Sequence, residues 1–325
     1  MAKERIYPFA VASVRSMENR LLTKQKLMQM AEAKTAEEAL KILADSDYGK
    51  TQVKDARDFE QMIQSNLEEA YQGVGKLIPA ETFMNIFRFK NDYHNIKVLI
   101  KEEISKTSGK KYLLRGGTIP LEELRKNFRE RNYMELPDID AKAVEEAIAQ
   151  FAKTRNGAYI DSILDKACFD TMRRVADQSG IAYISKYVTK LADVTNLKTL
   201  LRISVCNRTE EELLQNIVPG GELSAETLTR ALRNDDPLTV LRETSYANLC
   251  VGNMEQGFTA FEKACDDYLM EYVKEARYKT LTPEPVAAYI LAKENEAKCV
   301  RIIMTCKLRD IDPEIIKERV REAYV

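Results

Sequence analysis

Helix-breaking residues are scarce in this sequence. Its 325 residues include 12 Gly, 9 Pro and no Trp, which leaves few of the turn-formers that separate the short strands of sheet proteins. Ala, Glu, Lys and Leu are abundant instead, and these residues favour helix. No segment keeps the alternation of apolar and polar residues that a half-buried strand shows. The sequence therefore predicts an all-α protein.

Metal-ligand patterns are also missing. The chain has a single histidine, His94, and no pair of cysteines separated by two residues. A multi-histidine metal site is excluded, and neither a zinc site nor a disulfide framework is indicated. We expect reduced, mostly buried thiols and no cofactor or metal. The six cysteines all lie in the C-terminal half: Cys168, Cys206, Cys250, Cys265, Cys299 and Cys306.

The chain also lacks an excess of charge and a long apolar run. The net charge is −1 and the pI is near 6.2, so the whole chain carries no electrostatic signal for nucleic acid or an anionic bilayer. No stretch approaches 18 apolar residues, so direct membrane insertion is not expected. The apolar run Ile6 to Val14 follows Lys3 and Arg5, but Pro8 interrupts it, which argues against a signal peptide. We expect a cytoplasmic protein.

A helical motif recurs four times along the chain. Each copy has an acid or amide, then a base two residues later, inside an apolar stripe. The bases are Arg20, Lys97, Lys198 and Lys298, and the last three are 101 and 100 residues apart. Gly116-Gly117 returns as Gly220-Gly221 after 104 residues. The stripes of the second and third copies are Ile96, Leu99, Ile100, Ile104 and Leu197, Leu200, Leu201, Val205.

A period near 100 residues exceeds the 33 to 47 of common helical solenoids. We therefore predict three pseudo-symmetric helical domains, with approximate ranges 1–110, 111–208 and 209–325. Four copies do not divide evenly among three domains, so we hypothesise that the first and last copies lie together and complete one domain.

Start and stop signals indicate individual helices. Thr35 with Glu38 and Thr209 with Glu212 have the spacing of capping boxes, and Asp312 precedes a proline at the first helical position. Long helices are predicted near 53–78, 138–178 and 253–279. Breaks are expected at Pro79, Pro137, Pro219, Pro237 and Pro283.

Apparent enzymatic motifs do not withstand inspection. The segment 44–51 ends like a phosphate-binding loop, but Ala44 stands where glycine is required and a helix, not a strand, precedes it. The segment 73–76 fails in the same way. His94 corresponds to Thr195 in the next copy, which favours a structural role. The adjacent acids Glu122-Glu123 and Asp266-Asp267 are expected on the solvated surface.

The repeated bases are the candidate partner-binding residues. Pseudo-symmetry would place Arg20, Lys97, Lys198 and Lys298 at equivalent points of the assembly. Arg301 joins them because it replaces the apolar Ile100 and Leu201 of other copies, so the fourth helix is expected to face water or a partner there. The alternative is that each base lays its stem along the surface, or pairs with a nearby acid.

The chain resembles a known family. The opening Tyr7-Pro8-Phe9-Ala10-Val11-Ala12, the motif helices at 95–101 and 196–202 and the two Gly-Gly segments resemble the C subunit of bacterial and archaeal V/A-type ATPases. That protein is similar to the d subunit of eukaryotic vacuolar ATPases. The resemblance covers essentially all 325 residues.

The resemblance implies a funnel of three helical domains between the central rotor stalk, with its D- and F-type subunits, and the membrane proteolipid ring. Such a subunit transmits torque and has no catalytic residue or cofactor. It implies one copy within a hetero-oligomeric complex, peripheral to the inner face of the membrane. Whether the ion is H⁺ or Na⁺, and whether ATP is made or hydrolysed, stays open. The alternatives are a soluble helical scaffold for cytoplasmic partners and, less favoured, a helical enzyme.

Overall fold

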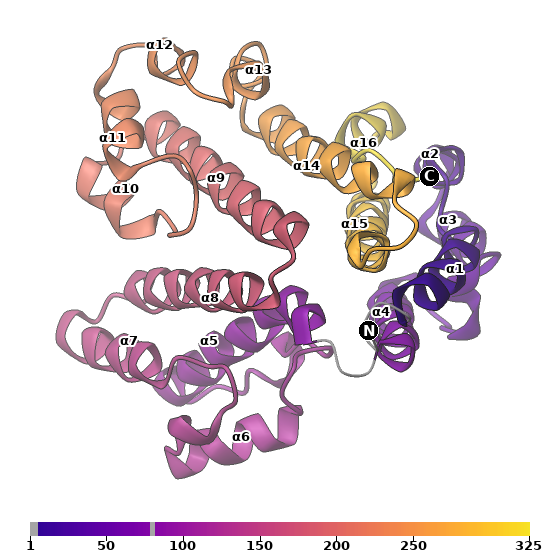
Figure 1. Ribbon diagram of the computed structural model, residues 1–325, viewed down its shortest axis with the longest axis horizontal. Helices are drawn as coiled ribbons and strands as arrows, with labels where there is room; N and C mark the ends of the chain where they lie inside the picture. The colour runs from indigo at the N-terminus through magenta and orange to yellow at the C-terminus, as the bar shows by residue number, and fades with distance from the viewer. Residues whose placement is uncertain (1–5, 79–81) are drawn as a thin grey trace. The chain divides into compact units, whose positions relative to one another are not determined.

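The computed structural model describes residues 6–78 and 82–325 (Figure 1). These residues form helices and turns without a strand, which confirms the predicted all-α class. The chain divides into two compact units. Unit 1 combines the described residues up to 78 with Ser245–Val325, and unit 2 is Thr82–Thr244. The division into ranges 1–110, 111–208 and 209–325 stays a prediction.

Unit 1 is built from two stretches of chain that are distant in sequence. Its helices are α1 (Ile6–Glu18), α2 (Lys24–Glu32), α3 (Ala36–Ala44), α4 (Phe59–Leu77), α13 (Ala247–Cys250), α14 (Phe258–Lys274), α15 (Glu284–Lys307) and α16 (Pro313–Arg319). α15 contacts α1, α2, α3, α4, α14 and α16. It is buried on most of its circumference, as expected for a helix surrounded by others.

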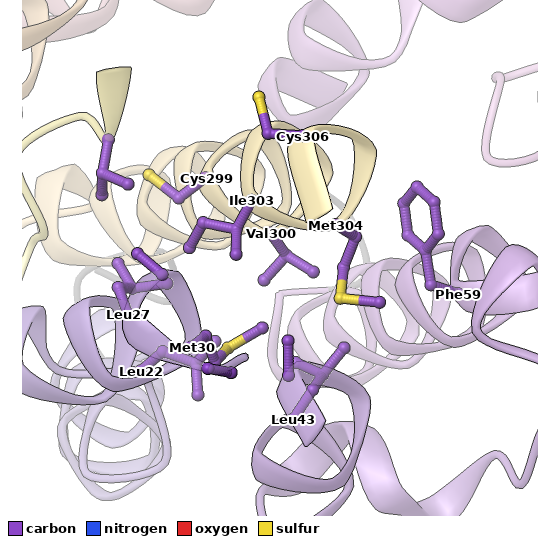
Figure 2. Packing of buried hydrophobic residues seen from close by; sticks show 14 of the residues in the cluster. Leu22, Leu27, Met30, Leu43, Phe59, Cys299, Val300, Ile303, Met304 and Cys306 are labelled. Atoms are coloured by element: carbon purple, nitrogen blue, oxygen red, sulfur yellow. The ribbon is translucent and has the colours of Figure 1, made fainter. Parts of the chain in front are cut away.

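The core of unit 1 joins its two stretches of chain. Figure 2 shows Leu22, Leu27, Met30 and Leu43 from the first stretch facing Val300 and Ile303 of α15. Met304 lies in the same cluster with Phe59 of α4, and both are buried. Burial of a side chain of this size stabilises the fold by roughly 1.5–3 kcal/mol. The two stretches therefore share one hydrophobic core.

Caps fix the helix starts of unit 1 where the sequence predicts them. The Thr35 hydroxyl accepts a hydrogen bond from the Glu38 N–H at 3.2 Å, and Glu38 accepts one from the Lys34 N–H at 2.8 Å. Asp312 accepts from the Glu314 N–H at 2.8 Å. The predicted helix 53–78 starts later, at Phe59, because a 3-10 turn η3 (Ala56–Asp58) precedes it. The predicted helix 253–279 is α14 followed by the turn η7 (Glu275–Tyr278).

Unit 2 is continuous in sequence. Its helices are α5 (Phe89–Ser105), α6 (Leu121–Glu130), α7 (Ala141–Thr154), α8 (Ala158–Ser179), α9 (Ala182–Val205), α10 (Glu210–Asn216), α11 (Ala225–Arg233) and α12 (Leu238–Leu241). α8 contacts α5, α7 and α9 (Figure 1). Thr209 and Glu212 form a reciprocal capping box at the start of α10, as predicted.

Two sequence predictions in unit 2 are wrong in detail. The helix predicted over 138–178 is two helices, because Arg155 adopts a left-handed conformation with φ 54° and Asn156-Gly157 separates α7 from α8. Ile104 and Val205, the last members of two apolar stripes, are 39% and 66% exposed. Both lie in the final turn of their helix, beyond the packed core.

Proline marks helix boundaries rather than kinks. Pro237 and Pro283 directly precede α12 and α15, Pro137 lies between the turn η6 (Tyr133–Glu135) and α7, and Pro219 lies between α10 and α11. Pro79 falls outside the described residues.

Candidate functional site

The motif helices of unit 2 each hold a loop through one buried carboxylate. Asp92 of α5 accepts hydrogen bonds from the N–H groups of Thr118 and Ile119, at 2.8 and 3.2 Å. Asp193 of α9, 101 residues later, accepts from the N–H groups of Glu222 and Leu223, both at 2.9 Å. Both carboxylates are 0% exposed. The same helix position therefore binds the same part of the following loop in two copies.

A buried amide one turn later makes a second, reciprocal contact. Asn95 donates to the Leu114 carbonyl and accepts from the Leu114 N–H, both at 2.8 Å. Asn196 makes the same pair with Val218, at 2.9 and 2.7 Å. An asparagine can satisfy a peptide group in this way because its amide carries both a donor and an acceptor. We call each Asp–Asn pair with its loop a loop clamp.

The repeated glycines are explained by the loop clamps. A Cβ atom on Gly117 would lie 2.1 Å from Asp92 Oδ1, and one on Gly221 would lie 2.1 Å from Asp193 Oδ1. Only glycine lets the loop backbone approach the carboxylate so closely. In the first clamp Arg88 also donates to the carbonyls of Gly116 and Gly117.

Burial sets the electrostatics of the first clamp. Desolvation raises the pKa of Asp92 above its usual range, while the hydrogen bonds from Thr118 and Ile119 oppose the shift. A buried carboxylate whose oxygens are occupied by loop donors has a positioning role. These carboxylates hold loops in place.

Unit 1 uses basic residues at the equivalent positions. Arg15 stands where Asp92 stands in the second copy, and Glu18 where Asn95 stands. Arg15 pairs with Glu18 at 2.8 Å and donates to the carbonyls of Ala276, Arg277 and Lys279 at 2.9, 2.8 and 3.1 Å. The first copy thus holds a backbone segment through its carbonyl groups.

The fourth copy carries Lys293 and Glu296 at these positions. Both are buried, and their charged atoms are 2.5 Å apart. Glu296 also accepts a hydrogen bond from the Leu22 N–H. This bond directly connects the first and fourth motif copies, which confirms the hypothesis that these copies lie together in one unit.

Two of the five candidate partner-binding bases form ion pairs with an acid of a neighbouring helix. Lys97 of α5 contacts Asp165 of α8 at 2.5 Å, and Lys298 of α15 contacts Asp266 of α14 at 2.6 Å. The acids are 101 residues apart and the bases 201, so the two pairs join different combinations of repeat positions. The expectation that Asp266 lies on the solvated surface is wrong.

Asp266 is 8% exposed because Arg321, itself 4% exposed, covers it. The Nε atom of Arg321 donates to Asp266 at 2.8 Å, while its Nη2 atom donates to Glu262 at 3.1 Å. Neighbouring Asp267 accepts from the Glu322 N–H at 2.6 Å. Adjacency in sequence gave no signal for this site, because the covering arginine lies 55 residues further along the chain.

The other candidate bases differ in their surroundings. Arg301 forms a bidentate pair with Glu60 of α4, with its Nε and Nη2 atoms 2.7 to 3.1 Å from the carboxylate oxygens. Its side chain is 41% exposed, so it faces water in part. Arg20 is exposed in the turn after α1, and Lys198 is half-buried on α9. The structure thus distributes these residues over both units.

The residues that resembled enzymatic motifs have structural roles. His94 lies 2.9 Å from the Tyr112 carbonyl oxygen through Nε2. Lys50 pairs with Asp47 and Glu69, in a 3-10 turn η2 (Asp47–Lys50) that follows helix α3. Gly73 and Lys76 lie within α4. Glu122 and Glu123 are exposed on α6, as expected.

The cysteines are free thiols, and five of the six are buried. Burial raises the pKa of Cys168, Cys250 and Cys299 to about 12, so these thiols stay protonated at neutral pH. Cys206 is exposed. The expectation that most of the cysteines are buried is confirmed.

A hollow of about 510 Å³ opens between α5 and α6 in unit 2. Its walls combine apolar Leu99 and Phe128 with acids and arginines. Arg125 lies 3.4 Å from Glu102, and Arg131 lies 3.2 Å from Glu103. The acidic and basic side chains that line the hollow balance one another.

Within the described ranges 6–78 and 82–325, no helix combines the length and apolar character needed to cross a bilayer.

Similarity to known proteins extends over almost the whole chain. The sequence profile of the ATP synthase (C/AC39) subunit family matches residues 10–319. The chain is 26% identical to the C subunit of the A-type ATP synthase of Methanocaldococcus jannaschii, over 96% of this chain and 85% of that protein. It is also 26% identical to the C subunit of the V-type sodium ATPase of Enterococcus hirae, over 96% and 97%. The C subunit of the A-type ATP synthase of Pyrococcus abyssi is 26% identical, over 97% and 90%. This chain belongs to the ATP synthase (C/AC39) subunit family.

Proposed function

We propose that this chain is the C subunit of a rotary V/A-type ATPase and connects the central rotor stalk to the membrane proteolipid ring. The observation that carries the proposal is the family match over residues 10–319, which includes most of both units. Relatives that match over nearly their whole length are named as the C subunit of A-type or V-type enzymes. In this proposal the chain transmits torque and performs no chemistry.

The internal contacts suit a part that must resist twisting. A rotor connector has to keep its loops fixed to its helices under load, and the loop clamps do this with buried hydrogen bonds from Asp92, Asn95, Asp193 and Asn196. Close-packed helical cores have low compressibility and transmit strain. Both features support a mechanical role.

The surroundings of the ionisable side chains support a non-catalytic role. Lys97, Lys298 and Arg301 are paired with acids of the same chain, and His94 contacts a backbone carbonyl. Catalytic groups usually combine a perturbed pKa with access to a cleft. Cys168 and Asp92 have raised pKa values, but both are buried and Asp92 is bound by its loop.

Arg20, Lys97, Lys198, Lys298 and Arg301 remain our proposed contacts to the stalk or ring. The paired members contribute a charge whose position is fixed by an acid, such as Lys97 by Asp165. Such pre-positioned charges give an interface its orientation and speed its formation. We further propose that the chain works as one copy on the cytoplasmic side, peripheral to the membrane.

The proposal is tested by purifying the tagged chain from its native cells in mild detergent. We expect stalk subunits of the D and F type and the proteolipid ring to copurify, and cross-links from this chain to reach both. A chain that emerges alone contradicts the proposal. Soluble partners without membrane enrichment favour a scaffold, and nucleotide binding by the isolated chain favours an enzyme.

A matched pair of variants tests the proposed contact residues. Arg301→Gln removes a candidate contact and its bond to Glu60, whereas Glu60→Gln removes the bond and keeps the arginine. If Arg301 contacts a partner, the first variant weakens copurification about tenfold and the second about twofold or less. Equal losses show that the ion pair only supports the fold.

A further inference from the structure

The segment from Lys106 to Arg115 concentrates positive charge. It contains Lys106, Lys110, Lys111 and Arg115, and no acidic residue occurs between Glu103 and Glu122. Charges of both signs are interspersed over the chain as a whole, whose net charge is −1. The balance over the whole chain therefore conceals a local cationic surface, which we call the basic segment.

The basic segment is exposed and its charges are unpaired. All four cations are exposed, and none forms an ion pair with any residue of the described ranges 6–78 and 82–325. Tyr112 in their midst is 58% exposed, and Lys111 lies 4.8 Å from the centre of its ring. Leu113 and Leu114 follow and are half-buried. The surface thus combines free cations with an exposed aromatic ring.

The backbone of this segment is held in place. His94 lies 2.9 Å from the Tyr112 carbonyl oxygen, Asn95 binds both backbone groups of Leu114, and Glu102 accepts from the Gly109 N–H at 3.1 Å. The cations therefore project from a defined scaffold.

The equivalent segment of the next copy has the opposite net charge. It carries Arg208 and the acids Glu210, Glu211 and Glu212. Three of its four charges are paired within the chain, since Arg208 contacts Glu212 at 3.2 Å and Glu210 contacts Arg233 at 2.7 Å. Positive charge is therefore a property of the basic segment and not of the repeat.

Lys106 itself is a costly choice for its position. It adopts a left-handed conformation with φ 57° directly after α5. The left-handed residues that follow α9 and α15 are Asn207 and Asp310, two and three residues after the helix ends, with φ 49° and 53°. Asparagine and aspartate tolerate this conformation better than lysine. The residue in the basic segment therefore adds charge where backbone geometry favours another residue type.

We propose that the basic segment binds the surface of an anionic phospholipid membrane. Clusters of lysine and arginine are attracted to anionic headgroups, and tyrosine favours the interfacial layer, where its ring is partly buried and its hydroxyl is hydrated. An acidic protein segment would satisfy the charges, but it would not account for the exposed ring of Tyr112 or the adjoining half-buried leucines. The contact is peripheral, so it agrees with the absence of a spanning helix in the described ranges. It rests on the proposed function only for its access to a membrane.

The test measures sedimentation of the full chain with vesicles. One set contains phosphatidylcholine with phosphatidylglycerol, and the other contains phosphatidylcholine alone. We expect binding to the anionic vesicles at low salt that weakens steeply as salt rises, because exposed charges are screened. Each cation near an anionic surface contributes about a fivefold gain. The quadruple variant K106N/K110Q/K111Q/R115Q should therefore lose more than tenfold in partition coefficient.

A matched control separates local from total charge. K34Q/K41Q/K54Q/K76Q removes the same charge from exposed lysines of unit 1 and should lose threefold or less. Tyr112→Ser, which keeps the carbonyl that His94 contacts, should lose two- to fivefold. Far-UV circular dichroism checks that each variant is folded. The asparagine at 106 is chosen because it suits the left-handed backbone.

The outcomes are decisive in both directions. Absence of binding to anionic vesicles at low salt overturns the proposal, as do equal losses in the two quadruple variants. If vesicles do not bind but the basic-segment variant loses the ring or stalk in copurification, the partner is an acidic protein surface. Copurification by itself tests the proposed function, so the two failures can be distinguished.

Discussion

Units 1 and 2 place opposite chemistry at the same position of the repeated helix. In unit 2, Asp92 and Asp193 accept hydrogen bonds from loop N–H groups. In unit 1, Arg15 donates to loop carbonyls, and Lys293 is buried against Glu296. The position holds a backbone segment in three of these four cases, although the sign of its charge is reversed. Geometry has been kept while the residue types changed.

The difference has energetic consequences. When a carboxylate accepts hydrogen bonds from backbone N–H groups, its partners belong to the loop backbone and not to a second side chain. A buried ion pair depends on a second side chain, and removal of one partner leaves an uncompensated charge. Loss of one partner from a buried ion pair of unit 1 should therefore cost more than loss of one partner from a half-exposed pair of unit 2.

The largest expected effect comes from breaking the buried ion pair between Asp266 and Arg321 in unit 1. Asp266→Ala leaves Arg321, which is 4% exposed, without its closest acid, and should lower the free energy of unfolding by about 3–5 kcal/mol. Asp165→Ala removes the equivalent acid of unit 2, whose side chain is 51% exposed, and should cost about 0–1 kcal/mol. Urea unfolding followed by circular dichroism measures both. Equal losses would remove the distinction between the units.

The glycines of the loop clamps give the next effect. Gly221→Ala would place a Cβ atom 2.1 Å from Asp193 Oδ1, so the carboxylate or the loop must move, at about 1–3 kcal/mol. Gly117→Ala should behave alike. Gly75→Ala is the control, because nothing lies within 4 Å of its Cβ position in α4 and it should gain up to about 1 kcal/mol. A tolerated alanine at 221 would show that the clamp is loose.

Removal of the clamping charge sharpens the comparison further. Asp193→Asn replaces one accepting oxygen with a donor that faces the N–H groups of Glu222 and Leu223, and should cost about 1–3 kcal/mol. Arg15→Met leaves three carbonyls, but those of Arg277 and Lys279 are in exposed bonds that water can replace. It should cost about 1 kcal/mol. A larger loss for Arg15→Met would reverse our ranking of the Asp193 and Arg15 contacts.

The smallest effect depends on pH. Burial tends to raise the pKa of Glu322, but hydrogen bonds from Lys24 and Lys274 prevail and lower it below its usual value of 4.5. A lowered pKa in the folded state stabilises the fold above pH 4.5, and this contribution is lost as pH falls through the folded pKa. Glu322→Gln should therefore reduce stability at pH 7 and match the original chain near pH 2. A difference that grows on acidification would contradict this assignment.

The sequence predicted the repeated framework better than its contacts. The bases Lys97, Lys198 and Lys298 and the two Gly-Gly segments were sufficient to find the period, because spacing along a helix is local information. The clamps were missed, although Asp92 with Asn95 and Asp193 with Asn196 share one spacing and the same period. That pattern was a usable signal. The repeated glycines at 117 and 221 were a second signal for the same clamps.

Other features could not be read from spacing. The burial of Asp266 depends on Arg321, 55 residues away, and a pair of adjacent acids gives no indication of such cover. The end of α7 depends on Arg155 in a left-handed conformation, which the surrounding helical pattern obscured even though Asn156-Gly157 follows it. The meeting of first and fourth copies was found because the copies were too many for three domains, and Leu22 with Glu296 gives that inference its physical contact.

The split of unit 1 around unit 2 sets an order for synthesis on the ribosome. Unit 2 is one continuous stretch, so all of its contacts are available once Thr244 has emerged. The core around Leu22 and Met30 needs Val300 and Ile303, which are translated more than two hundred residues later. Closing so long a loop is slow, since non-local contacts form only after its entropy cost has been met. The first helices must therefore wait with their apolar faces uncovered, and a chaperone that shields them would raise the yield of unit 1 while leaving unit 2 unaffected.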